Sequence, residues 1–294
     1  MSGDAGCPLY VLNGTFKWGE APSPVLQDVT LAVPQGELVM VLGSVGSGKS
    51  TLLAALVGQA DRVEGSVYCQ IVRHAGRWQG SVAYLTQQVW LMNATLRDNI
   101  LFFRPYDQFR YEATVRACAL THDFALLQDG DLTLYGDKGV NLSGGQRQRI
   151  GLARAVYQNA DVYLLDDPFS AVDAQVSQHI FHHVLGPSGL LRKKVRCRVA
   201  TDRWTMSAVQ TRVVVTHQLV YLPHADKVVF LHAGRVQEAG TFSELLDRRG
   251  ALAEFLLHCI SEMATRDDFQ YDLDVVEDIV TKLAVEYNRS ELLT

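Results

Sequence analysis

A glycine-rich turn between an apolar strand and a helix is the feature that most limits how this chain can fold. Residues 37–42, ELVMVL, predict a buried strand, and residues 49–57, KSTLLAALV, predict a helix. The turn between them, Gly43 to Ser50, reads GSVGSGKS and fits GxxxxGK[ST]. Such glycines let backbone N–H groups close around an anion, and the helix N-terminus adds a positive dipole end. We therefore predict a phosphate-binding loop, with Lys49 on the β- and γ-phosphates and Ser50 as a Mg²⁺ ligand.

Two further patterns follow downstream. Residues 162–166, VYLLD, predict a buried strand ending in a carboxylate, and Asp166 can then hold Mg²⁺. Residues 142–146 read LSGGQ, in which Ser143 is a good N-cap for a helix over 144–157. The LSGGQ run ends 20 residues before Asp166. Each pattern is weak alone, but the phosphate loop strengthens both.

The order of the apolar segments indicates the fold class. Continuous apolar strands alternate with helices, which favours a parallel sheet covered on both faces. Strand signals are nearly absent from 95–159, so this block predicts an inserted helical unit. We expect an α/β fold: a P-loop core with a parallel sheet, an N-terminal antiparallel β-subdomain and an inserted α-helical subdomain. The predicted strands are 9–18, 28–33, 37–42, 65–72, 81–85, 162–166, 212–216 and 227–232, and the other predicted helices are 49–57, 173–185 and 241–257.

Composition narrows the class of protein further. Of 294 residues, 48% are hydrophobic and 20% charged, which excludes wholesale disorder. The net charge of −5 argues against broad nucleic-acid binding. No run approaches the roughly 20 apolar residues that span a bilayer. The five cysteines form no CxxC pair, which favours reduced thiols.

Shifts in composition predict the domain organisation. We expect a disordered N-terminus or a cloning remnant over 1–8 and one domain over 9–260, with its helical subdomain at about 95–160. A basic loop over 192–210 is expected to be a solvated surface loop, with contact to anionic lipid or a phosphorylated segment as the alternative. An acidic linker with a short amphipathic helix is expected over 261–294.

The combined motifs carry a resemblance to a known family. The phosphate loop, LSGGQ and LLDD, followed by a late His217, resemble the nucleotide-binding domain of ABC transporters. The runs GVNLSGGQRQRIGLARAVY and YLLDDPFSAVDA resemble the first such domain of the multidrug-resistance-associated (ABCC) subfamily. The resemblance covers about residues 10–257. It implies the ABC ATPase fold, binding of ATP with Mg²⁺, and a place at the cytoplasmic face of a membrane.

The resemblance also implies partners. These are a second nucleotide-binding domain and the transmembrane domains of the same transporter. Residues 90–100, WLMNATLRDNI, resemble the region that faces the coupling helices of those domains. Nucleic acid is not an expected partner, and the isolated domain is expected to be monomeric.

Individual residues take roles from the same resemblance. Trp18 matches the aromatic that stacks on adenine; a Trp in the core or on an edge strand is the alternative. Gln87 matches the glutamine near Mg²⁺ and the attacking water, with Gln88 as an alternative register. His217 matches the switch histidine that contacts the γ-phosphate. Asp173 matches the D-loop at the dimer interface, and a plain N-cap is its alternative.

The candidate site residues fall into three groups. The catalytic candidates are Asp167, His217 and Gln87. The metal ligands are Ser50, Gln87 and Asp166. The nucleotide-binding candidates are Trp18, Gly43, Ser44, Val45, Gly46, Ser47, Gly48, Lys49, Ser50, Thr51, Ser143, Gly144, Gly145 and Gln146.

One position departs from the family pattern. Most active ABC domains carry Glu after the Mg²⁺ aspartate, where it polarises the attacking water, but this chain has Asp167. The shorter side chain withdraws the carboxylate by about 1 Å, and a misplacement of that size can cost roughly 10²-fold in rate. We therefore expect tight ATP binding and slow hydrolysis at this chain's own site. Its complete LSGGQ is expected to complete the nucleotide site of the second nucleotide-binding domain, where hydrolysis is expected to be fast.

Three functions remain open at this point. The first is an exporter domain whose ATP-dependent dimerisation powers or gates transport, with weak ATPase activity in isolation. The second is an ATP-gated regulatory module of a channel-type ABCC protein with negligible hydrolysis, which Asp167 also suits. The third is a soluble ABC ATPase acting on DNA or ribosomes, which the acidic charge and the single nucleotide domain disfavour.

Overall fold

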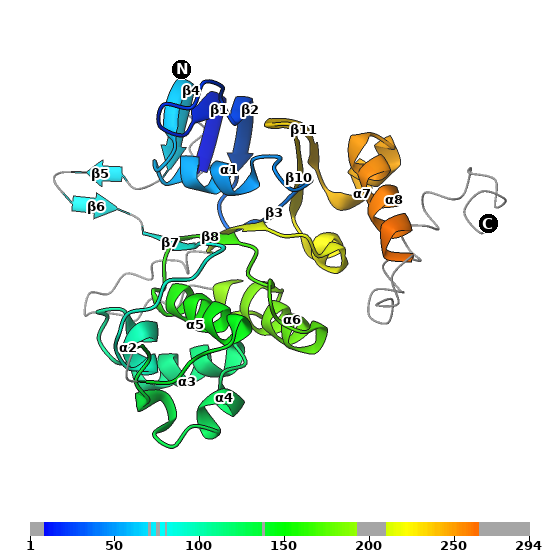
Figure 1. Ribbon diagram of the computed structural model, residues 1–294. Coiled ribbons are helices and arrows are strands. Elements are labelled where there is room, and N and C mark those ends of the chain that lie inside the picture. The colour runs from blue at the N-terminus through cyan, green and yellow to red at the C-terminus, as the bar shows by residue number, and fades with distance from the viewer. Residues whose placement is uncertain are drawn as a thin grey trace, which may run out of the picture.

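The computed structural model describes residues 9–69, 72–74, 77–79, 81–136, 139–192 and 210–264. Three predicted segments fall outside this set: 1–8, positions 193–209 of the basic loop and positions 265–294 of the acidic linker. Figure 1 shows an antiparallel sheet, a larger sheet across the middle, and a group of helices beyond it. No helix within the described ranges is long and apolar enough to cross a membrane.

The antiparallel sheet has the strand order β2-β1-β4. Its strands are β1 (Leu9–Lys17), β2 (Leu26–Val33) and β4 (Asp61–Cys69), and β5 (Val72–His74) pairs with β6 (Arg77–Gln79) beside it. β4 begins four residues earlier than its apolar pattern predicts, because Asp61 and Arg62 pair with the end of β1 despite being polar. Gly65 has a positive φ of 80° and faces the Asn13 carbonyl at a register shift, where a Cβ would collide.

The main sheet has the strand order β11-β10-β3-β9-β8-β7. Strands β10, β3, β9, β8 and β7 are mutually parallel, and β11 runs antiparallel to β10. β11 was not expected, because its polar sequence RVQEAG lacks the strand pattern. It forms a hairpin with β10 through Ala233 and Gly234, which both have positive φ. The bounds are β3 (Leu38–Leu42), β7 (Val82–Leu85), β8 (Val162–Asp166), β9 (Thr211–Val215), β10 (Lys227–His232) and β11 (Arg235–Gly240).

Two hydrophobic cores cover the two faces of the main sheet. Successive side chains of a strand point to opposite faces, so one strand supplies both cores. Val39 and Val41 pack with α1 (Lys49–Leu56) and the antiparallel sheet. Leu38 and Met40 pack with α5 (Gly144–Tyr157) and the other helices. α1 and α5 therefore cover opposite faces (Figure 1), and the predicted α/β class with a doubly covered parallel sheet is confirmed.

The described residues between β7 and β8 form helices joined by loops, with isolated bridges at Thr95 and Tyr135. Thr95 and Asp107 cap two of its helices by accepting hydrogen bonds from backbone N–H groups three residues on. Its elements are α2 (Leu96–Leu101), α3 (Gln108–Ala117), α4 (Thr121–Ala125), η1 (Gly130–Leu132) and α5.

Three predicted segments need correction. The helix over 173–185 becomes α6 (Ala174–Ile180) and a wider π-turn, η2 (Phe181–Leu185). The helix over 241–257 is two helices, α7 (Phe242–Arg248) and α8 (Ala251–Ala264), because Arg249 adopts a left-handed conformation that ends α7. The predicted basic loop is shorter at both ends. Arg192 belongs to η3 (Leu190–Arg192), and Gln210 is buried and donates to the Ala160 carbonyl at 3.1 Å.

A buried asparagine of α2 is hydrogen-bonded to α5 through Arg154. The Asn99 side chain is 0% exposed. Its Oδ1 accepts from Met92 N (2.7 Å) and from Arg154 Nη2 (3.0 Å). Its Nδ2 donates to the carbonyls of Met92 and Thr95, both at 3.0 Å. Arg154 also donates to the backbone carbonyls of Asn99 and Trp90. Two of the three hydrogen bonds that the structure describes for its guanidinium are therefore made to Asn99.

We predict that Asn99→Ala lowers the free energy of unfolding by about 2–4 kcal/mol, because buried groups of Met92 and Arg154 lose their partners. Urea denaturation measures the change. Gln108→Ala is the control, since it removes only an exposed helical contact to Glu112 and should cost less than about 0.5 kcal/mol. Equal losses for the two variants would contradict the role given to Asn99.

Candidate functional site

The glycine-rich loop is shaped by positions that only glycine tolerates. A Cβ on Gly43 would collide with the Leu231 carbonyl oxygen of the neighbouring strand β10. Gly46 and Gly48 have φ values of 81° and 102°, in the left-handed region that other residues rarely adopt. Gly48 is also the N-cap of α1. The loop therefore turns directly from the end of β3 into the first turn of α1. The first backbone N–H groups of α1 have no partner within the helix and are available to an anion at its N-terminus.

Lys49 lies inside this loop. Its Nζ donates to the carbonyl oxygens of Gly43 (2.8 Å) and Ser44 (2.9 Å). Burial lowers the pKa of Lys49, while the negative charges of Asp166 and Asp167 oppose that shift. The hydroxyl of Ser47 is buried and, among the described residues, has no hydrogen-bond partner. A cationic amine and an unpartnered hydroxyl in a glycine loop suit an anionic ligand.

Two adjacent carboxylates stand at the end of β8. Asp166 is 3% exposed, and its side chain hydrogen-bonds Ser50 at the start of α1. Burial raises the pKa of Asp166, although Ser50, Lys49 and His217 oppose the shift. Burial also raises the pKa of Asp167, with His217 opposing it. A buried carboxylate paired with a hydroxyl is a donor set that Mg²⁺ accepts.

The backbone of Asp167 is held by four hydrogen bonds. Its N–H donates to the Val215 carbonyl (2.9 Å) of β9. Its carbonyl accepts from Ser170 N (3.1 Å), Ser170 Oγ (2.9 Å) and Gln148 Nε2 (3.2 Å). Asp167 has a φ of 50°, which Asp tolerates better than most residues. The sequence did not point to Gln148, because nothing local in it reveals a contact of an α5 side chain with a carbonyl 19 residues away.

His217 follows β9 and faces the same charges. Burial and the positive charge of Lys49 lower the pKa of His217, while Asp167 and Asp166 oppose the shift. The imidazole is therefore neutral at pH 7, with one nitrogen free to donate and the other to accept. β3, β9 and β8 are parallel neighbours, so their carboxyl ends bring Lys49, Asp166 and His217 to one edge of the sheet.

Two further candidates lie beside this edge. The indole Nε1 of Trp18 donates to Thr51 Oγ1 at 3.1 Å, on the first turn of α1. Trp18 is 45% exposed, so the alternative of a core tryptophan is wrong. Gln87 is exposed and follows β7, whose Leu85 pairs with Leu165 next to Asp166.

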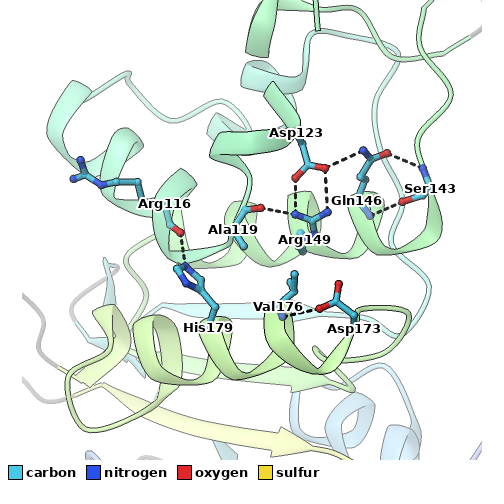
Figure 2. Close-up of polar contacts among 9 residues, drawn as sticks. All are labelled: Arg116, Ala119, Asp123, Ser143, Gln146, Arg149, Asp173, Val176 and His179. Atoms are coloured by element: carbon cyan, nitrogen blue, oxygen red, sulfur yellow. Dashed lines mark hydrogen bonds and ion pairs between the residues drawn. The ribbon is translucent and has the colours of Figure 1, made fainter. Parts of the chain in front are cut away.

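The LSGGQ residues lie elsewhere. Ser143 caps α5: its Oγ accepts from Gln146 N (3.1 Å), while Gln146 Oε1 accepts from Ser143 N (2.9 Å). Figure 2 shows this reciprocal pair beside Asp123. A Cβ on Gly145 would collide with the Ala171 carbonyl, so this glycine also serves packing. Among the described residues, no hydrogen bond joins Ser143 or Gln146 to the phosphate loop.

Asp173 is an N-cap. Its carboxylate accepts from Val176 N at 2.9 Å and starts α6 (Figure 2). The structure thus gathers the glycine loop, Trp18, Gln87, the two carboxylates and His217 at one edge, and it leaves the LSGGQ run with α5. The gathered groups can hold a polyphosphate and a divalent cation and can present a carboxylate and a neutral imidazole to the terminal phosphate.

Comparison with known proteins agrees with this geometry. The profile of the ABC transporter family matches residues 26–170. ATP-binding cassette sub-family C member 3 of Homo sapiens is 45% identical over 251 residues, which cover 85% of this chain and 15% of the relative. Multidrug resistance protein mrp-7 of Caenorhabditis elegans is 47% identical over 251 residues, covering 84% and 15%. ATP-binding cassette sub-family C member 2 of Mus musculus is 43% identical over 242 residues, covering 82% and 14%.

The chain thus spans about one seventh of the length of these relatives, and the matched region contains the phosphate loop, LSGGQ and the paired carboxylates. Domains of this kind bind nucleotide and are ATPases. The chain belongs to the ABC transporter family, in its sub-family C.

Proposed function

We propose that this chain is the ATP-binding domain of an ABC exporter at the cytoplasmic face of a membrane. It powers or gates transport by ATP-dependent dimerisation with a second nucleotide-binding domain, and it acts on the transmembrane domains of the same protein. The observation that carries the proposal is the cluster of Lys49, Ser50, Asp166 and His217 at one edge of the main sheet. Membership of the ABC transporter family, with a multidrug resistance protein among the relatives, supports transport as the activity.

The glycine loop fits the phosphates of ATP. Residues 43–51 provide the backbone N–H groups, and Lys49 can exchange its bonds to the Gly43 and Ser44 carbonyls for bonds to phosphate oxygens. Trp18 stands over the first turn of α1, where its exposed ring can stack on adenine. Ser50, Asp166 and Gln87 would hold Mg²⁺, which when bound neutralises charge on the phosphates.

Hydrolysis at this chain's own site is slow in our proposal. Asp167 orients the attacking water, but its side chain is one methylene shorter than Glu. The four hydrogen bonds on its backbone prevent the main chain from advancing to compensate. His217, neutral at pH 7, contacts the γ-phosphate. ATP binding remains strong because none of the phosphate-loop groups is altered.

The LSGGQ run serves the other domain in this proposal. α5 covers the face of the sheet opposite α1, and among the described residues no hydrogen bond joins Ser143 or Gln146 to this chain's own phosphate loop. Ser143, Gly144, Gly145 and Gln146 are proposed to close over the nucleotide of the second domain, and the isolated chain is then a monomer.

A second candidate function rests on Asp167 alone. A short carboxylate that barely supports hydrolysis also suits an ATP-gated regulatory module of a channel-type protein. Solute movement and intrinsic ATP turnover in the full-length protein separate the two functions, because only the exporter couples turnover to transport.

We predict that the Asp167→Glu variant hydrolyses Mg-ATP faster than the wild-type chain, by roughly 10²-fold, because the added methylene restores the carboxylate position. Steady-state phosphate release measures turnover, and nucleotide binding is checked for both proteins. Asp173→Glu is the control, since this exposed N-cap lies in the same loop outside the cluster. If the wild-type chain hydrolyses ATP as fast as the Asp167→Glu variant, Asp167 does not limit the rate.

We predict that Trp18→Ala weakens ATP binding by roughly 5- to 150-fold, because base–aromatic stacking is worth about 1–3 kcal/mol. Isothermal titration calorimetry measures the dissociation constant. Trp90→Ala is the matched control, since it removes another exposed indole whose ring lies over Arg154. Equal affinities of the Trp18 variant and wild type would reject adenine stacking.

We predict that Asp167→Asn raises the melting temperature at pH 7–8 without nucleotide or metal. The native pKa of Asp167 is raised, so the ionised carboxylate destabilises the fold above that pKa and the penalty vanishes below the unfolded value near 4. The gain should therefore shrink as the pH falls toward 4. Asp173→Asn, which keeps a capping side chain, should change little at any pH. A gain that is independent of pH would exclude desolvation as its cause.

A further inference from the structure

Asp123, on the short helix α4, contacts two residues of the first turns of α5. Gln146 Nε2 donates to Asp123 Oδ1 at 2.9 Å. Arg149 donates to both oxygens of the same carboxylate and also to the Ala119 carbonyl just before α4 (Figure 2). The side chains of Asp123 and Arg149 are largely buried, so water screens their charges less than those of a surface pair, and removal of one partner would leave the other charge buried without a counter-charge.

The carboxylate decides which way the Gln146 amide points. A carboxylate only accepts hydrogen bonds, so the NH₂ group of Gln146 must face Asp123. Its Oε1 then faces the backbone N–H of Ser143, 2.9 Å away. In return, Gln146 N donates to Ser143 Oγ. Asp123 therefore selects the amide orientation that completes the capping box of the LSGGQ run.

The apolar packing between α4 and the start of α5 is incomplete. A cavity of about 290 Å³ separates them, lined by Leu120 and Phe124 on one side and Leu142 and Ile150 on the other. An incompletely packed interface lets a helix shift unless polar contacts hold it. Asp123 and Gln146, which are hydrogen-bonded to each other, also line this cavity.

We infer that Asp123 is a positioning residue that acts through Gln146 to keep Ser143 oriented for the nucleotide of the second domain. The inference rests on the proposed function in one respect, namely that LSGGQ contacts a nucleotide. Nothing in the LSGGQ pattern itself identifies Asp123, which lies 23 residues before Gln146.

The test compares Asp123→Asn with a matched control, Asp131→Asn. Asp131 lies in η1 of the same helical region and accepts two hydrogen bonds from Arg97, at 2.8 and 2.9 Å, and one from Tyr111. Each variant thus removes one carboxylate from a bidentate pair with an arginine. Of the two aspartates, only Asp123 is hydrogen-bonded to α5 within the described part of the chain.

Hydrogen exchange of the Ser143 amide, followed by NMR in the 294-residue chain, is the first measurement. Asn offers one acceptor oxygen where Asp123 offers two, so Arg149 and Gln146 compete for it. Loss of about one net hydrogen bond should then speed exchange roughly 5- to 10-fold in Asp123→Asn and leave Asp131→Asn near wild type. The double variant Asp123→Asn/Gln146→Glu should restore slow exchange, because the Asn amide can donate to a Glu that still accepts from Ser143. Unchanged exchange in Asp123→Asn overturns the inference.

ATP turnover of the full-length transporter is the second measurement, with Ser143→Ala alongside. We expect Asp123→Asn to lower kcat about tenfold with little change in KM, and Asp131→Asn to stay within about twofold of wild type. Normal turnover in Asp123→Asn, when Ser143→Ala is inactive, overturns the positioning role. If Ser143→Ala also turns over normally while Ser143 exchange is faster in Asp123→Asn, the positioning of Ser143 stands and the proposed use of LSGGQ fails.

Discussion

The parallel pairing of β3, β9 and β8 is the constraint on which the site depends. Each strand ends at the same edge of the main sheet, and each end carries one part of the chemistry: the glycine loop, His217 and the carboxylates. No two of these parts are close in the chain, so their proximity comes from the register of the sheet. The side chains of the three strands are buried throughout and mostly apolar, and they stabilise that register from both faces.

Burial of charge at this edge opposes the stability of the fold. Lys49, Asp166, Asp167 and His217 all have pKa values shifted toward their neutral forms, because each loses water. The mutual attraction of unlike charges offsets only part of that cost. A bound polyphosphate and cation would supply the missing charges. The same burial that lowers the stability of the fold therefore strengthens the binding of a charged ligand.

Polar junctions organise the helices on the other face of the sheet. Asn99 with Arg154 joins α2 to α5, and Asp123 with Arg149 joins α4 to α5. Both arginines extend from α5, which makes this helix the common support of the helical region and of the LSGGQ run at its start. Movement of that region would therefore carry Ser143 with it, which suits a segment proposed to meet a second domain.

Local sequence determined the glycine loop, strands β3 and β8, the capped start of α5 and the family, because these signals lie within a few neighbouring residues. It missed β11 and the break between α7 and α8, where pairing to β10 and the left-handed Arg249 outweigh local pattern. Only the tertiary structure decided that Gln148 holds Asp167, that Thr51 holds Trp18, and that Asp123 orients Gln146. Those contacts join residues 19 to 33 positions apart, and folding alone brings them within hydrogen-bonding distance.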